Sequence, residues 1–427
     1  MRHIRVFHPL SAALIVGLSV GCATDAASTG DSTTVATSGA IVDSAGGSTV
    51  PSAADTVKPA GAPAGTSSAA PAPAAAPAPA GPYASQLAEW RRPTSSPVIR
   101  GLYVNRFAAH SQRRMQWLLG VADSTEINAL VIDMKDEFGL NYRPANQAYQ
   151  RYVSKDHGVV RNVKALIDSV HAHGVLAIAR IVVFKDPAAA SLNDDWTIRR
   201  PDGTVWRDEK GNAWVNPYNR EVWDYNLAVA EELVGLGFDE IQWDYIRFPE
   251  PYSRLPKQIF PGANGVSKPD NLASFLKLAQ ERMHKVGVRS TADVFGLVTT
   301  VPGPLEIGQH WEKVAPVSDV LLPMTYPSHY PRGSYGVARP NAEPYRIVKA
   351  AIDGAKRRND KLGITAAEHV RPWIQAFSLG QPPYDHTHLV EQKRAIYDAG
   401  YKGWVLWHPG SKYEVFLRGL EKAPMGQ

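Results

Sequence analysis

Short apolar runs alternate with amphipathic helical stretches along most of the chain. The runs are rich in Val, Ile, Leu, Phe and Trp, and several alternate apolar with polar residues, as half-buried strands do. Strands that alternate with helices are typical of a parallel sheet, because a helical crossover returns the chain to the same edge. The expected strands are residues 100–108, 129–139, 175–186, 238–249, 289–300, 319–327, 361–369 and 402–410.

Eight such units over residues 98–420 predict an α/β fold, a (β/α)8 TIM barrel. An open doubly wound sheet is the alternative, but no Gly-rich phosphate loop follows the first expected strand. Two amphipathic stretches, residues 162–174 and 219–237, illustrate the crossovers. In the second stretch Asn219 is the expected N-cap, and glycines stand near the end.

The first 82 residues differ in composition from the rest of the chain. Residues 1–21 have a basic start, an apolar segment and a small residue before Cys22, which predicts a lipoprotein-type signal peptide. Residues 22–82 consist mainly of Ala, Pro, Ser and Thr and have few large apolar side chains, so we expect a disordered linker. This linker would act as a tether for the domain that follows.

The run "LSVGC" resembles a lipobox, which implies that Cys22 is lipidated and becomes the mature N-terminus. An ordinary cleaved signal peptide with an incidental cysteine is the alternative. Lipidation predicts a protein of the cell envelope, anchored through lipid on the extracytoplasmic side. In a Gram-negative organism this means the outer membrane or periplasm, and Ala23 favours the outer membrane by resemblance to lipoprotein sorting rules.

The composition is that of a soluble globular protein, with 44% hydrophobic and 20% charged residues. The net charge of +5 is small for a chain of 427 residues, so no nucleic-acid partner is expected. Cys22 is the single cysteine, which excludes a disulfide within the chain. No cofactor is expected.

Polar and aromatic residues accumulate near the C-terminal ends of the expected strands, where TIM barrels carry their active sites. For any single Asp, a helix cap or an ion pair is the simpler explanation, and for any single Trp a place in the core. Their collective placement favours a glycan-binding mouth. The expected substrate-binding residues are Asp133, Lys135, Asp136, Arg180, Asp186, Trp214, Gln242, Arg247, Tyr326, Trp373, Trp407 and His408.

Two carboxylates stand late in adjacent expected strands, Asp244 in "QWDYI" and Asp293 in "TADVF". Burial and mutual repulsion can give two such groups different pKa values, so that one is an acid and the other is ionised. Glycoside hydrolases use such a pair. We expect Asp244 to be the nucleophile or charge stabiliser and Asp293 the general acid, with Glu368 in reserve.

The strand around Asp244 has a clear alternation. Ile241 and Trp243 are expected to face the helices, whereas Gln242 and Asp244 face the interior. Arg247 is expected to keep Asp244 ionised; alternatively, these two residues form a merely structural ion pair.

A long crossover, residues 194–217, contains turn signals on either side of Trp206. We expect a small hairpin over the mouth, with Trp206 and Trp214 as substrate contacts.

Metal chemistry is the other class of enzyme to weigh. Asp133, Asp136 or Asp186 could hold a divalent cation, but the histidines show no spacing typical of a ligand set. His171 and His173 form an H-x-H pair that precedes the third expected strand, on the face opposite the expected site.

Six segments together resemble the DUF4015 family of glycosyl hydrolase domains. They are "YVNRFA", "VIDMKDEFG", "IARIVVFKD", "WVNPYNREVWDYN", "FDEIQWDYIRFP" and "RPWIQAF". The resemblance runs from about Arg100 to Tyr413 and implies a TIM barrel that hydrolyses a polysaccharide or another glycan. The chain departs from the family pattern at Ala376, in place of Asp, and at His408, in place of Asn. A noncatalytic, glycan-binding envelope lipoprotein is therefore the alternative.

Overall fold

The computed structural model describes residues 78–155 and 158–424. The expected signal peptide, the lipidation site Cys22 and the expected linker as far as residue 77 lie outside the described residues. Within the described part, no helix is long and apolar enough to cross a membrane.

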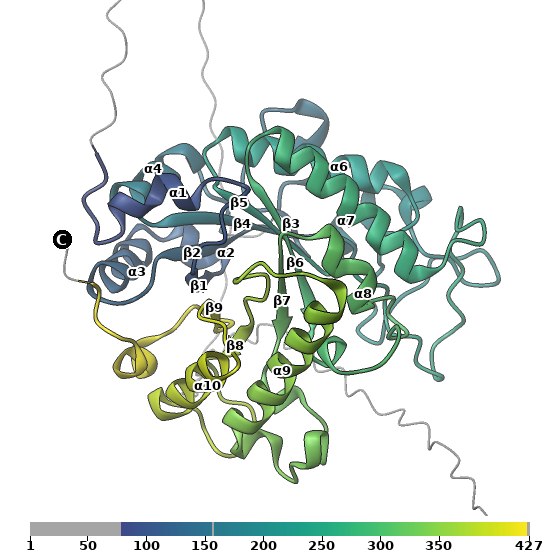
Figure 1. Cartoon of the computed structure of the whole chain (residues 1–427). Helices are drawn as coiled ribbons and strands as arrows, with labels where there is room; N and C mark the ends of the chain where they lie inside the picture. Colours follow the sequence, from purple (N-terminus) through teal and green to yellow (C-terminus); the bar gives the residue numbers. More distant parts are fainter. Residues whose placement is uncertain (1–77, 156–157, 425–427) are drawn as a thin grey trace, which may run out of the picture. The chain divides into compact units, whose positions relative to one another are not determined.

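Parallel strands close into a barrel (Figure 1), which confirms the predicted (β/α)8 fold. Over the described residues eight strands follow chain order around the ring, and the first pairs with both the second and the last. A short strand, β3 (Gly139–Leu140), pairs antiparallel with the end of the second barrel strand. The barrel strands are β1 (Arg100–Val104), β2 (Ala129–Asp136), β4 (Leu176–Val182), β5 (Glu240–Asp244), β6 (Arg289–Phe295), β7 (Val320–Met324), β8 (Trp373–Gln375) and β9 (Trp404–Trp407).

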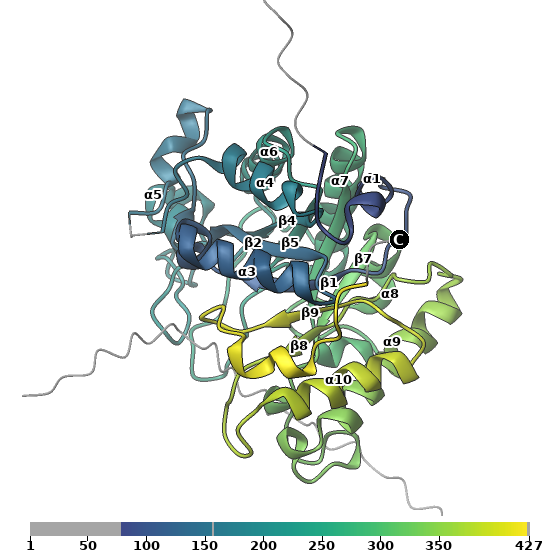
Figure 2. The same ribbon diagram turned by 90° about the vertical axis from the view of Figure 1, so that its left-hand side faces the viewer.

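Helices surround the barrel (Figures 1 and 2). Asn219 caps α6 as expected, because its side chain accepts hydrogen bonds from the backbone N–H groups of Glu221 at 2.8 Å and Val222 at 3.4 Å. In both views α9 and α10 lie side by side. The outer helices are α2 (Arg106–His110), α3 (Gln112–Ser124), α4 (Val163–Ala172), α5 (Pro187–Leu192), α6 (Arg220–Gly235), α7 (Lys268–Lys285), α8 (Trp311–Val314), α9 (Pro344–Leu362) and α10 (His386–Asp398).

The strand β5 shows how the alternation in the sequence becomes two faces. Ile241 and Trp243 are fully buried against the helices, and the Trp243 ring lies 5.6 Å from that of Phe275 in α7. Gln242 points inward, where its side chain binds Asp293. The predicted faces of this strand are confirmed.

The segment before β1 closes the N-terminal end of the barrel. It contains a 3-10 turn (Ala84–Gln86) and α1 (Leu87–Trp90). Tyr83, Leu87 and Trp90 are buried with the apolar residues of the barrel interior. The folded domain therefore begins before residue 98, because this segment covers apolar side chains that water would otherwise reach.

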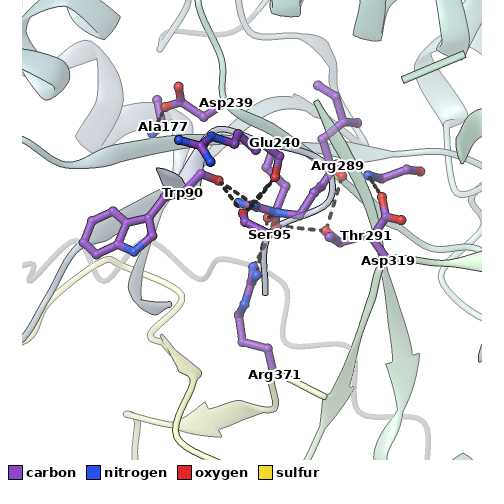
Figure 3. A network of polar contacts seen from close by, with 12 residues as sticks. Trp90, Ser95, Ala177, Asp239, Glu240, Arg289, Thr291, Asp319 and Arg371 are labelled. Atoms are coloured by element: carbon purple, nitrogen blue, oxygen red, sulfur yellow. Dashed lines mark hydrogen bonds and ion pairs between the residues drawn. The ribbon is translucent and has the colours of Figure 1, made fainter. Parts of the chain in front are cut away.

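A buried ionic network fixes this segment to the barrel (Figure 3). Glu240 Oε2 accepts from Arg289 Nε at 3.0 Å, and its Oε1 accepts from Arg371 Nη1 at 2.7 Å. Arg289 also donates to the carbonyl oxygen of Trp90 and, at 2.9 Å, to the hydroxyl of Ser95. Burial opposes ionisation of Glu240, but Arg371 and Arg289 hold its pKa below the usual value. This network closes the end opposite the expected site.

The prediction of a seventh strand at residues 361–369 is wrong. The seventh strand of the barrel is β8, which comes later in the chain, at Trp373–Gln375. Leu362 is the last residue of α9, and Gly363 ends the helix with a φ of +70°, a left-handed conformation that favours glycine. Leu362 and Ile364 pack against the core at this helix end, so their apolar pattern belongs to a helix terminus.

Candidate active site

Three carboxylates from three strands meet one guanidinium at the C-terminal end of the barrel. Arg180 of β4 forms ion pairs with Asp133 of β2 and with Asp244 of β5. Its Nε lies 3.8 Å from Oδ2 of Asp293 in β6. All four residues are buried. One cation thus holds three acidic groups together.

Strand register explains this convergence. Arg180 lies opposite Asp133 across the β2–β4 pair and opposite Gln242 across the β4–β5 pair. Because alternate residues of a barrel strand face the interior, these side chains enter the barrel at one level. Asp244 is the next inward residue after Gln242 and the last residue of β5.

Asp293 is bound by two neutral donors. Gln242 Nε2 donates to both carboxyl oxygens, at 2.9 and 3.2 Å, and Trp373 Nε1 donates to Oδ1 at 2.7 Å. Burial and repulsion by Asp244 raise the pKa of Asp293 well above its usual value, although Arg180 and the two donors oppose the rise. Asp293 therefore retains its proton to a higher pH than an exposed Asp, as a general acid requires.

Asp133 is a second carboxyl of raised pKa beside Arg180. Burial raises its pKa, while Arg180 and the hydroxyl of Tyr103, which donates to Oδ2, oppose the rise. Burial and the neighbouring Asp133 in turn hold the pKa of Tyr103 well above its usual value. Tyr103 is thus a neutral donor at the mouth.

Aromatic side chains line the other half of the mouth, and we call this group the aromatic wall. The Tyr326 ring stacks on Trp407 with centroids 5.4 Å apart, and Phe377 meets Trp407 edge-on at 5.1 Å. Tyr103 joins the wall to the carboxylates, because its ring lies 6.0 Å from Trp407 and its hydroxyl binds Asp133. Tyr103, Tyr326, Trp373 and Phe377 are buried, whereas Trp407 is partly exposed. Among these rings Trp407 therefore offers an accessible flat face beside the carboxylates, which suits a sugar ring. The wall consists of Tyr103, Tyr326, Trp373, Phe377 and Trp407.

The structure brings most of the expected site residues together. Asp136 lies at the rim, where Oδ2 accepts from Asn141 Nδ2 at 3.2 Å and lies 3.6 Å from Arg106 Nε. The expected residues that gather at the mouth itself are Asp133, Arg180, Gln242, Asp244, Asp293, Tyr326, Trp373 and Trp407.

Lys135 and Asp186 do not line the mouth, contrary to the prediction. The β2–β4 register shifts between Asp133 and Lys135, and this irregularity directs Lys135 toward α6. There Lys135 is fully buried, pairs with Asp186 at 2.7 Å and lies 5.4 Å from the ring of Tyr225. The pair connects the barrel to its helical layer.

Arg247 does not contact Asp244, so this expected pair is wrong. Tyr245 has a φ of +51°, and the turn it makes directs the chain away after β5. Arg247 instead binds Glu250 at 3.1 Å and lies 4.9 Å from the ring of Trp214. The cation beside Asp244 is Arg180.

The crossover of residues 194–217 has three short antiparallel bridges, Thr197–Val215, Arg199–Val205 and Arg207–Ala213. Trp214 lies 5.9 Å from the ring of Tyr245, which follows β5, so the segment is on the expected side of the barrel. Both Trp206 and Trp214 are fully buried within it. Their rings hold the crossover together and do not form an open sugar platform.

Glu368 lies at the wrong end of the barrel for a reserve acid. Its Oε2 accepts from the backbone N–H of Gly403 at 2.9 Å, just before β9 begins. The misplaced seventh strand caused this error. Burial raises the pKa of Glu368, but no carboxylate of the mouth is nearby.

The two departures from the family pattern lie outside the mouth. The His408 ring faces Tyr413 at 6.1 Å, and burial lowers its pKa to about 4. Ala376 is fully buried in the apolar layer between strands and helices. Neither residue therefore removes a group from the carboxylate cluster.

The three acidic residues considered as metal ligands point to different partners. Asp133 binds Arg180 and Tyr103, Asp136 faces Arg106, and Asp186 pairs with Lys135. Among the described residues, no group of three or more His, Cys, Asp or Glu side chains is arranged to hold a metal ion.

Sequence reasoning missed Tyr103 and Phe377 as members of the site. Tyr103 stands in an inward position of the first expected strand and is the first residue of the family segment "YVNRFA", so the alternation could have identified it. Phe377 follows β8, whose position was predicted wrongly, so no correct face could be assigned to it.

Residues 101–413 match the family DUF4015, described as "Putative glycosyl hydrolase domain". The chain belongs to this family. The expected membership is thus confirmed, and with it a glycoside hydrolase-like function at the level of the family. No curated protein matches the sequence.

Two solved structures similar to this DUF4015 chain illustrate the relationship. A hypothetical protein from Ruminiclostridium thermocellum is 34% identical, with a TM-score of 0.41, over 45% of this chain and 97% of its own. The PgaB (BpsB) glycoside hydrolase domain from Bordetella bronchiseptica is 13% identical, with a TM-score of 0.53, over 76% of this chain and 99% of its own. At 13% identity, the similarity to the Bordetella domain establishes a shared fold.

Proposed function

We propose that this DUF4015 chain is a glycoside hydrolase that cleaves a polysaccharide or cell-envelope glycan. Asp244 is the nucleophile or charge stabiliser, and Asp293 is the general acid. The observation that carries the proposal is the contrast between these two carboxyls around Arg180. Asp244 forms an ion pair, whereas burial and Asp244 itself raise the pKa of Asp293. Glycosidases use such a division of roles.

The arrangement suits the steps of hydrolysis. Asp293 donates its proton to the glycosidic oxygen as the bond to the anomeric carbon breaks, and the carboxylate of Asp244 faces the positive charge that develops there. Water then supplies the new hydroxyl group. Its proton passes to the acid residue, which restores the starting state. Arg180 fixes Asp244 in place, and Trp407, the partly exposed ring of the aromatic wall, supports the sugar ring.

The variant Asp293→Asn tests the assignment of the acid. Because Asp293 is active when protonated and its pKa is raised, wild-type activity should fall as pH rises through that pKa, and the variant should lack this limb. Turnover of a glycan should fall by about 100-fold or more. An aryl glycoside of the same sugar, with a leaving group that needs no proton, should undergo its bond-breaking step almost as fast as with the wild type, measured as the first equivalent of phenol released.

Asp133→Asn is the matched comparison, because Asp133 also has a raised pKa beside Arg180. Kinetics across pH on both substrates would separate the two residues. Asp133 would be the acid if Asp133→Asn slowed hydrolysis of the glycan but not of the aryl glycoside, and Asp293→Asn did not show this difference. Equal slowing of the bond-breaking step on both substrates by Asp293→Asn would contradict the acid role.

Cys22 leads to a prediction about location. We propose that the mature chain is anchored in the cell envelope through lipid on Cys22, with its domain on the extracytoplasmic side. Several acyl chains on one residue give stable membrane binding. The variant Cys22→Ser should therefore leave the membrane fraction, as immunoblots of separated membrane and soluble fractions would show. Unchanged membrane association of the variant would contradict lipid anchoring.

A further inference from the structure

Two phenylalanine rings stand exposed at the C-terminal end of the barrel, beside the mouth. Phe107 lies in α2, directly after β1, and Phe138 lies in the turn after β2. Their exposed fractions are 47% and 48%. Single exposed apolar residues are common, but two aromatic rings on neighbouring strand ends next to a site are informative.

One buried cation holds both rings. The guanidinium carbon of Arg106 lies 4.8 Å from the centroid of Phe107 and 4.4 Å from that of Phe138. Arg106 is itself fixed, because Nη1 donates to Ser154 Oγ at 3.0 Å and Nε lies 3.6 Å from Asp136. The rings therefore lose little conformational freedom when a ligand binds, which favours affinity.

A chain of contacts joins this pair of rings to the carboxylates. Asp136 faces Arg106, and its carboxyl accepts from Asn141, whose Nδ2 also donates to the backbone carbonyl of Asp133 at 3.1 Å. Asp133 in turn binds Arg180. A buried polar network thus connects the base of the exposed rings to the carboxylate cluster at the ends of β1, β2 and β4.

We propose that Phe107 and Phe138 form a distal subsite for a sugar unit of the same glycan that reaches the carboxylates. The proposal rests on the proposed function and deepens it, because it adds a second sugar-binding position on the same polymer. The C–H face of a sugar ring stacks on an aromatic face, whose electron-rich surface attracts it. The subsite contributes binding and takes no part in bond cleavage.

Matched substitutions at both rings test the subsite. In an Asp244→Asn background, which removes cleavage, full-length protein is run through gels containing bacterial exopolysaccharide or solubilised cell-wall glycan strands. Phe107→Leu/Phe138→Leu should reduce retardation about tenfold, whereas Phe107→Tyr/Phe138→Tyr should keep it. Val286→Ala, a change at a 42% exposed apolar residue just after α7, is the control at the other end of the barrel.

The outcomes separate the subsite from the catalytic proposal. With Asp244 intact, the leucine pair should raise KM for the polymer about tenfold and leave the hydrolysis of a short aryl glycoside unchanged. If the wild type hydrolyses the polymer and Phe107→Leu/Phe138→Leu changes neither the gel retardation nor the KM, the subsite alone would be overturned. Polymer binding that depends on the rings, without any hydrolysis, would overturn the proposed function alone. Absence of both binding and hydrolysis would overturn both.

Discussion

Asp244→Asn should reduce glycan hydrolysis by at least about 1,000-fold while the protein remains folded. Asn keeps the size of the side chain but cannot attack or stabilise positive charge as a carboxylate does. Arg180 retains its ion pair with Asp133 and its approach to Asp293, so the cluster should keep its shape. Initial rates on the glycan and the thermal midpoint of the same sample measure the two effects.

Glu250→Gln is a suitable control for this variant, since it makes the same chemical change on the loop after β5. Glu250 pairs with Arg247 and not with Arg180, so its loss should leave the rate within about twofold of the wild type. A folded Asp244→Asn protein with full activity would remove Asp244 from the mechanism. A collapse of the thermal midpoint would give Asp244 a structural role instead.

Glu240→Gln should lower the stability of the fold strongly and leave activity nearly unchanged, in contrast to Asp244→Asn. Glu240 is the first inward residue of the strand that ends at Asp244, and its carboxylate neutralises two fully buried guanidiniums, Arg289 and Arg371. Removing one partner of a buried ionic network costs about 3–5 kcal/mol. For a domain of this size, that corresponds to a drop of roughly 4–7 °C in the thermal midpoint.

Glu281→Gln provides the control, because the Lys277–Glu281 pair is exposed on α7 and exposed pairs contribute little. Its midpoint should match the wild type. The activity of folded Glu240→Gln measured well below its midpoint should be close to normal, since the network lies at the far end of the barrel. An unchanged midpoint in calorimetry would show that the network does not hold the base of the barrel.

The alternation of side chains made the barrel and part of the site predictable. In "QWD", the alternation of side chains along a strand places Gln242 and Asp244 inward, independently of the conformation of the loops. The same alternation in the neighbouring strand places Asp293 beside them. These residues converge because strand ends in a closed barrel share one rim. The carboxylates and the inward Trp407 follow from this rule alone, whereas Trp373 lies beyond the strand expected at residues 361–369.

The errors arose where backbone geometry departs from regular alternation. The positive φ of Tyr245 turns Arg247 away from the mouth, and the irregularity after Asp133 turns Lys135 outward. Gly363 ends a helix where the apolar pattern suggested a strand. Such local events depend on packing with segments distant in the sequence, so Arg180 could be recognised as the central cation only in the folded chain.

Release of new reducing ends is the most direct test of the claim that this chain hydrolyses glycans. Purified full-length protein and its Asp244→Asn variant would be incubated side by side with bacterial exopolysaccharide and cell-wall glycans. The proposed mechanism predicts that the wild type generates reducing ends from at least one of these polymers and that the variant generates none above the enzyme-free blank. A wild-type protein that binds such a polymer without releasing any reducing ends would contradict it.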